Sequence, residues 1–191
     1  MGSSQSYPGL TEDVLEDYIS LTYLSKGEIL HLMKKFYSIN PQILEADFNH
    51  RFHKDDVIAK FGTIKNNPFR DRLFRVFSSK GDDYFSFEDL LDLCSVMSHN
   101  CPADVKAVWA FRIFDLDEDK QISDGDISKI LDRLTACEDK ETCLDEVSKE
   151  KIAKEIIKEM NLDGTGSISI SEFKLIMARL PEFESSFYFR L

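Results

Sequence analysis

The chain has 191 residues, of which 42% are hydrophobic and 15 are phenylalanine, so it is long and apolar enough to form a substantial core. Its net charge of −11 argues against nucleic acid as a partner, because phosphate binding needs clustered lysine and arginine. Helix-forming residues are common while glycine and proline are few, which favours an all-α fold.

The first residues, Met1 to Ser6, match the pattern for N-myristoylation with Gly2 as the acceptor. The same residues also fit an ordinary flexible start or a cloning remnant. A single acyl chain gives only marginal membrane binding, and no basic patch follows in the sequence. Membrane contact through this group would therefore need a membrane-bound partner as a second anchor.

Two helix starts are visible in the next residues. Thr11 is a candidate N-cap for a short acidic helix over residues 12–18. Ser25 and Glu28 form a capping-box pattern that opens a helix running to about Ser38. Pro41 then ends that helix, because proline disfavours helical geometry in the residue before it.

Residues 41–66 are the least regular part of the sequence, with a short helix expected over 55–61 and a surface loop over 50–53. Pro68 suits the first turn of another helix. The apolar residues of that helix recur at helical spacing and are Phe69, Leu73, Phe74 and Phe77.

Residues 115–126 place oxygen-bearing side chains at positions 1, 3, 5, 9 and 12 of a twelve-residue segment, with Ile122 at position 8. This is the EF-hand loop pattern, whose hard oxygen ligands suit Ca²⁺ or Mg²⁺. An acidic run alone would fit a solvated loop, but here apolar helical patterns flank it. The candidate metal ligands are Asp115, Asp117, Asp119, Gln121 (through its backbone carbonyl), Ser123 and Asp126.

Two residues of this loop depart from the usual pattern. Lys120 stands at position 6, where glycine normally makes the turn, so a non-glycine residue has to adopt a positive φ. Asp126 stands at position 12 in place of glutamate and is one methylene shorter. The shorter side chain reaches an ion with fewer oxygens, so we expect weaker Ca²⁺ binding and notable Mg²⁺ competence.

Residues 161–172 repeat the pattern with the usual Gly166 and Glu172 at positions 6 and 12. Uncharged residues replace carboxylates at positions 1 and 5, which weakens binding but keeps the geometry of a Ca²⁺ site. The candidate ligands are Asn161, Asp163, Thr165, Ser167, Ser169 and Glu172.

Aligning Phe85 with Ile122 and Ile168 makes residues 78–89 a third loop, followed by a helix over 90–97. Lys80 occupies position 3 of that loop, so we expect no metal there. EF-hands fold in pairs, which predicts a degenerate first hand within residues 26–60. The polar stretch 135–147 is interpreted as the linker between the third and fourth hands.

These elements predict an all-α protein with four EF-hand units in two lobes, like calmodulin and recoverin, with hands 1 and 2 degenerate. The expected parts are an N-terminal segment (1–25), a lobe without metal (26–100), a metal-binding lobe (101–180) and a hydrophobic tail (181–191). The tail either packs permanently on the core or acts as a movable plug over a groove that accepts a partner helix. Its candidate groove residues are Phe183, Phe187, Phe189 and Leu191.

The remaining residues show no catalytic arrangement. The four cysteines form no CxxC pair and fit reduced thiols in the cytosol. The histidines form no zinc pattern, and no nucleophile–base pair or phosphate-binding loop is recognisable. We therefore expect a protein that is not an enzyme.

Several segments together resemble the calcium- and integrin-binding family. They are Met1-Gly2, residues 21–29 (LTYLSKGEI), 67–73 (NPFRDRL) with 75–77 (RVF), 85–90 (FSFEDL), 110–115 (AFRIFD) and 181–187 (PEFESSF). The resemblance implies metal in hands three and four only, a third hand closed by aspartate (here Asp126) and a myristoylated N-terminus.

The resemblance also implies a non-enzymatic adaptor that binds helical cytoplasmic segments of membrane proteins, such as integrin α tails or mechanotransduction-channel subunits. The expected partner is an amphipathic or apolar helix, and the expected location is the cytoplasm, peripheral to the plasma membrane. Two alternatives stay open: a regulatory subunit of an enzyme, as in the calcineurin B chain, and a myristoyl-switch calcium sensor or plain calcium buffer. The identity of the partner, the Ca²⁺ to Mg²⁺ preference and the oligomeric state also stay open.

Overall fold

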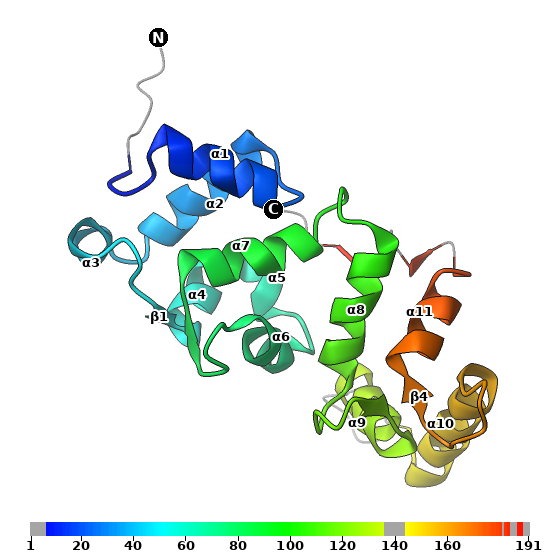
Figure 1. Cartoon of the computed structure of the whole chain (residues 1–191). Helices are drawn as coiled ribbons and strands as arrows, with labels where there is room; N and C mark the ends of the chain where they lie inside the picture. The colour runs from blue at the N-terminus through cyan, green and yellow to red at the C-terminus, as the bar shows by residue number, and fades with distance from the viewer. Residues whose placement is uncertain (1–6, 136–143, 181, 184–186, 189–191) are drawn as a thin grey trace. The chain divides into compact units, whose positions relative to one another are not determined.

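The structure is a computed structural model that describes residues 7–135, 144–180, 182–183 and 187–188. Helices joined by turns and two short antiparallel sheets make up these residues, so the expected all-α class is confirmed (Figure 1). The chain divides into two compact units. We call them the N-terminal unit, which comprises the described residues up to Cys101 together with Tyr188, and the C-terminal unit, Pro102–Phe187.

The N-terminal unit contains seven helices and one two-stranded sheet among its described residues. In chain order these are α1 (Glu12–Leu21), α2 (Lys26–Tyr37), α3 (Pro41–Ala46), β1 (Phe52–His53), α4 (Lys54–Lys60), α5 (Gly62–Lys65), α6 (Arg70–Phe77), β2 (Tyr84–Phe85) and α7 (Phe87–Val96).

Local capping explains where the first two helices begin. Thr11 accepts a hydrogen bond from the Val14 N–H, and Ser25 forms the predicted capping box with Glu28. Both predicted helices are confirmed, and α2 ends before Ser38 as expected.

Residues 41–66 are more ordered than the sequence indicates. Pro41 begins α3 at its first turn, capped by the Asn40 side chain, and α4 and α5 follow. The prediction of a surface loop over residues 50–53 was wrong, because Phe52 is buried and forms β1 with His53. The helix predicted to begin at Pro68 begins at Arg70, and Pro68 lies in the preceding turn.

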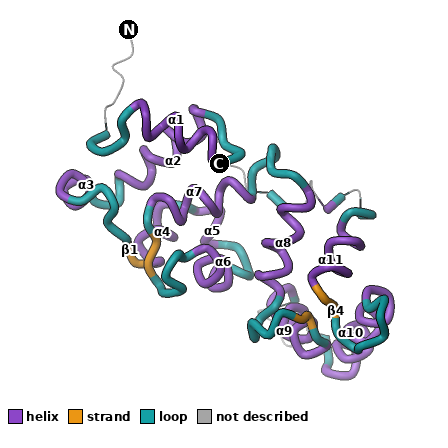
Figure 2. Tube along the Cα trace, in the orientation of Figure 1, coloured by secondary structure: helices purple, strands orange, loops and turns teal. Residues whose placement is uncertain are grey.

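β1 and β2 pair antiparallel, with Phe52 opposite Phe85 (Figure 2). Aromatic rings then form the core of this unit. Phe36 of α2 contacts Phe52 and Phe87 with ring centroids 5.3 and 5.6 Å apart, and Phe74 contacts Phe85 at 4.5 Å. These edge-on and tilted contacts are the favoured arrangements of aromatic pairs. The sheet therefore ties the segment around residue 52 to the loop over 78–89.

The C-terminal unit contains α8 (Ala103–Phe114), β3 (Gln121–Ile122), α9 (Asp124–Leu134), α10 (Glu146–Met160), β4 (Ile168–Ser169) and α11 (Ile170–Met177). Figure 1 shows α11 beside α8, and α10 beside α9. Its core is a cluster that includes Phe111, Ile122, Ile168 and Phe173. Part of the predicted linker, residues 136–143, lies outside the described residues, and α10 begins at Glu146 within the stretch predicted to be linker.

Within the described parts of both units, no helix combines the length and apolar character needed to cross a bilayer.

Candidate metal centres and the adjoining apolar pocket

The loop between α8 and α9 brings three carboxylates together. Asp115, Asp117 and Asp119 each place one carboxylate oxygen within 4.8 Å of the others. Asp126, at position 12, is buried at 1% exposure. Hard divalent cations are bound by oxygen ligands grouped in this way.

Asp115 shows the electrostatic strain of this grouping. Burial raises the pKa of its carboxyl group, the Lys120 N–H hydrogen bond at 3.0 Å lowers it, and the charges of Asp119, Asp126 and Asp117 raise it further. A bound cation would replace the water lost by burial and neutralise the crowded charge. The residues present therefore fit a divalent cation.

The backbone of this loop has the shape that the EF-hand pattern predicts. Lys120 has φ 71°, so the predicted positive φ at position 6 is confirmed, and Glu118 at position 4 has φ 63°. In the loop over 161–172, glycines adopt this region at the same two positions, with φ 76° and 91°. The 115–126 loop thus reaches the same geometry at a steric cost that glycine avoids.

In the 161–172 loop the side chains at positions 1 and 3 turn toward the loop backbone. Asn161 Oδ1 accepts hydrogen bonds from the N–H groups of Gly164 (2.9 Å) and Thr165 (3.2 Å). Asp163 Oδ1 accepts one from Thr165 at 3.0 Å. These bonds hold both side chains on the inner side of the loop, where an ion would bind.

Glu172 closes this loop at position 12 and is 7% exposed. Its Oε1 accepts hydrogen bonds from the N–H groups of Leu162 (2.6 Å) and Asp163 (3.1 Å), and its Oε2 accepts from the Ser169 hydroxyl and N–H. The Ser169 hydroxyl contributes most to a pKa of about 2 for Glu172, below the usual 4.5. The carboxylate is therefore ionised and held across the loop.

Positions 9 and 12 of each loop also start the helix that follows. Ser123 and Asp126 form the capping box of α9, and Ser169 and Glu172 form that of α11. The carboxylates that would close around an ion are thus the third residues of two helices. A change at either carboxylate acts directly on the start of its helix.

The two loops are joined by the β3–β4 sheet, in which Ile122 pairs with Ile168 and Gln121 with Ser169. The Ser167 hydroxyl also donates a hydrogen bond to Gln121 Oε1 at 3.1 Å. Two predicted position-7 residues therefore contact each other through their side chains.

An apolar pocket of about 390 Å³ lies beside the two loops in the C-terminal unit. Apolar side chains from α8, both strands, α9, α10, α11 and the chain end line it. They are Phe114, Ile122, Ile127, Ile130, Leu131, Leu134, Ile156, Met160, Ile168, Phe173, Met177, Phe183 and Phe187.

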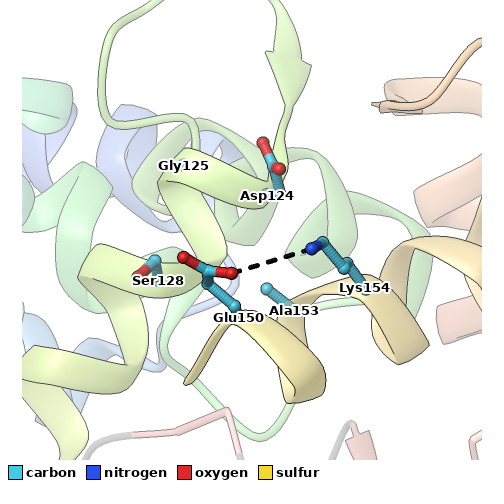
Figure 3. Close-up of a pocket in the computed structure, with 6 residues that line it drawn as sticks. All are labelled: Asp124, Gly125, Ser128, Glu150, Ala153 and Lys154. Carbon is cyan, nitrogen blue, oxygen red and sulfur yellow. Dashed lines mark ion pairs between the residues drawn. The ribbon is translucent and has the colours of Figure 1, made fainter. Parts of the chain in front are cut away.

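A second hollow lies between α9 and α10, and four of the six residues that line it have polar or charged side chains (Figure 3). Asp124, Gly125 and Ser128 of α9 line one side of the hollow, and Glu150, Ala153 and Lys154 of α10 line the other. Glu150 and Lys154 form an ion pair, with Lys154 Nζ 3.7 Å from Glu150 Oε2. The helix α9 is therefore amphipathic, with one face in the apolar pocket and another on this exposed hollow.

The predicted tail residues fall into two groups. Phe183 and Phe187 are half-buried, stack with ring centroids 5.8 Å apart and line the apolar pocket. Phe189, Leu191 and the predicted lipidation site Gly2 lie outside the described residues. The contributions of α8 and α10 to the pocket were not predicted, although the four-residue spacing of Ile156 and Met160 indicates a shared apolar face.

Comparison with known proteins supports the assignment of these loops. A family model described as an EF-hand domain pair matches residues 104–178. This match confirms that the last two loops belong to a pair of EF-hands.

Similarity to named proteins extends over the whole chain. Calcium and integrin-binding family member 2 of Drosophila melanogaster is 35% identical over 186 residues, covering 95% of this chain and 96% of the relative. The Homo sapiens protein of that name is 31% identical, and Homo sapiens calcium and integrin-binding family member 3 is 30% identical. Both alignments cover 100% of each chain.

Proposed function

The chain belongs to the calcium and integrin-binding family of EF-hand proteins, and we propose that it is a divalent-cation-responsive adaptor for membrane proteins. Its partner is a helical cytoplasmic segment of a membrane protein, of the integrin α tail or channel subunit type. The protein catalyses no reaction in this proposal.

The apolar pocket of the C-terminal unit is the observation that carries this proposal. Its lining comes from several helices, and every side chain in it is apolar. An amphipathic helix binds such a surface through apolar residues spaced at i, i+3, i+4 and i+7. Phe183 and Phe187 already insert apolar rings from this chain, which supports a site that accepts aromatic or aliphatic anchors.

The two loops would bind the cation, with Ca²⁺ in the 161–172 loop and either Ca²⁺ or Mg²⁺ in the 115–126 loop. Mg²⁺ competence rests on Asp126, whose short side chain favours a lower coordination number. The proposed ligands are the twelve predicted from the sequence, six in each loop.

Metal binding and partner binding are coupled in this proposal because α9 and α11 each contribute to both a metal loop and the apolar pocket. Asp126 and Ile127 are adjacent in α9, and Glu172 and Phe173 are adjacent in α11. The first residue of each pair is a proposed ligand and the second lines the pocket. An ion changes partner binding only as far as it favours the binding-competent arrangement of these helices.

Attachment to the plasma membrane from the cytoplasm is the last part of the proposal. Myristoylation at Gly2 would supply one weak anchor, and the membrane-protein partner would supply the second.

A peptide titration tests the coupling. A fluorescent amphipathic peptide with the sequence of an integrin α cytoplasmic segment is titrated with full-length protein in Ca²⁺, in Mg²⁺ and in chelator. We expect tighter binding with either ion, and weaker ion dependence in Glu172→Gln. The matched control is Glu159→Gln, which removes the same charge from an exposed position of α10. Equal affinity in all three buffers would refute metal coupling, and no binding in any buffer would refute this choice of partner.

A further inference from the structure

The loop over residues 78–89 keeps EF-hand geometry although it lacks the full set of ligands. The Tyr84 N–H donates to Asp82 Oδ1 at 3.0 Å, and the Ser79 N–H donates to Asp89 Oδ1 at 2.9 Å. The metal loop over 115–126 has the equivalent bonds between its positions 7 and 5 and between its positions 2 and 12. Such geometry in a loop with Lys80 at position 3 calls for a physical explanation.

The guanidinium of Arg51 lies at the centre of this loop. Its two terminal nitrogens bind the Asp82 carboxylate in a fork at 2.7 and 2.8 Å. Nη2 also donates to Ser78 Oγ at 2.9 Å and to the Tyr84 carbonyl at 2.6 Å, and lies 3.6 Å from Asp89 Oδ2.

The oxygens around Nη2 belong to positions 1, 5, 7 and 12 of the loop, which are ligand positions in a metal-binding EF-hand. We propose that the 78–89 loop is a cation site that Arg51 occupies permanently, with the guanidinium in place of a divalent ion.

The fold holds Arg51 in this position. It directly precedes β1, whose pairing with β2 fixes the segment against the 78–89 loop. Its side chain is 15% exposed, and the adjacent Phe52 is buried in the core. Arginine keeps its charge at every physiological pH, and its planar fork matches a carboxylate.

The charge balance agrees with this assignment. Asp82 and Asp89 bring two negative charges, and Arg51 lowers the pKa of Asp82 through its hydrogen bonds. The Lys80 side chain is exposed. One guanidinium therefore compensates half of the charge that these two carboxylates bring to the site, without an ion.

This inference goes beyond the proposed function, whose metal and partner sites lie in the C-terminal unit. With the Arg51 guanidinium in the position of an ion, the 78–89 loop of the second hand keeps the arrangement of an ion-bound EF-hand whether or not metal is present. Metal sensing is then confined to the third and fourth hands.

Amide hydrogen exchange followed by NMR tests the assignment on the full-length protein. The Ser86 N–H also donates to Asp89, through Oδ2 at 2.8 Å. Arg51→Ala should accelerate exchange of the Ser79, Tyr84 and Ser86 amides by roughly 10- to 100-fold, because the charged bonds from Arg51 that hold their acceptors Asp82 and Asp89 are lost. Guanidinium chloride at millimolar concentration should reverse most of this acceleration, while equal sodium chloride should not. The matched control Arg70→Ala removes an exposed arginine of the same unit and should leave these amides unchanged.

Two results with Arg51→Ala would overturn the proposal: unchanged exchange of the loop amides, or equal effects of guanidinium and sodium on that exchange. If Arg51→Ala does not fold, Arg51→Lys keeps the charge without the fork, and faster exchange confined to the same amides is expected. Unchanged exchange in Arg51→Lys would then decide against the assignment.

In the unaltered protein, chelator should shift the amide signals of residues 115–126 and 161–172 but not those of 78–89. Movement of the 78–89 signals would contradict a permanently filled site.

Discussion

Replacing Phe183 and Phe187 by serine tests whether the end of the chain competes with a partner for the apolar pocket. Both rings are half-buried in that pocket and stack on each other. Full burial of a phenylalanine contributes about 1.5–3 kcal/mol, so half-burial of each ring contributes about 1 kcal/mol. Ring stacking adds about 0.5 kcal/mol at the lower end of its range.

The two rings together therefore contribute about 2.5 kcal/mol before the entropy of ordering the tail is subtracted. Fixing the two side chains costs about 0.5 kcal/mol of rotamer entropy each, which leaves about 1–2 kcal/mol. A partner that must displace the rings loses that free energy. The double variant Phe183→Ser with Phe187→Ser should consequently bind a helical peptide roughly 5- to 30-fold more tightly.

Fluorescence anisotropy with a labelled amphipathic peptide in saturating Ca²⁺ measures this gain. The matched control is Leu180→Ser, which removes an exposed apolar side chain that is not part of the pocket lining. Weaker binding by the double variant would show that the partner uses the two rings as contacts. Unchanged binding would show that it binds elsewhere, and either result refutes competition.

Three further predictions concern the metal loops. Asp126→Glu should raise the ratio of Ca²⁺ affinity to Mg²⁺ affinity by roughly tenfold, because a longer side chain can supply a second oxygen. Calorimetry with each ion measures this ratio, and an unchanged ratio would contradict the prediction. Lys120→Gly should stabilise the metal-free C-terminal unit by about 0.5–1 kcal/mol, because glycine adopts the positive φ of this position without the steric cost of a side chain. Urea unfolding followed by Trp109 fluorescence measures the change, and a lower unfolding midpoint would refute it. Glu172, with its pKa lowered from 4.5 to about 2, should stabilise the protein above pH 4.5 and lose that contribution as the pH falls toward 2; thermal unfolding in chelator should show this loss in the unaltered protein and not in Glu172→Gln.

The local signals in the sequence predict much of this structure. Ser25 precedes Glu28 by three positions and forms the expected capping box. Ser123 and Ser169, which were predicted only as metal ligands, have the same spacing to an acidic residue and also form capping boxes. The alignment of Phe85 with Ile122 and Ile168 is confirmed by the strands at these positions, because position 8 of each loop pairs with its neighbour. Such features depend on residues close together in the chain and are therefore readable without tertiary structure.

The features that depend on distant residues were missed. Arg51 lies 27 to 38 positions before its partners Ser78 and Asp89, and nothing next to it in the sequence indicates a buried ion pair. The first hand has no recognisable ligand pattern, and Phe52 opposite Phe85 is the signal that would have located it. The full pocket lining was also unpredictable, because it requires several helices and the chain end to converge.

The bond between Ser167 and Gln121 and the pairing of β3 with β4 have a thermodynamic consequence for ion uptake. An ion that rigidifies one loop also orders the two-stranded sheet that joins it to the other, so the second ion encounters a loop that has less conformational freedom left to lose. Binding of two ions should then be cooperative, with a steeper isotherm than two independent sites would give.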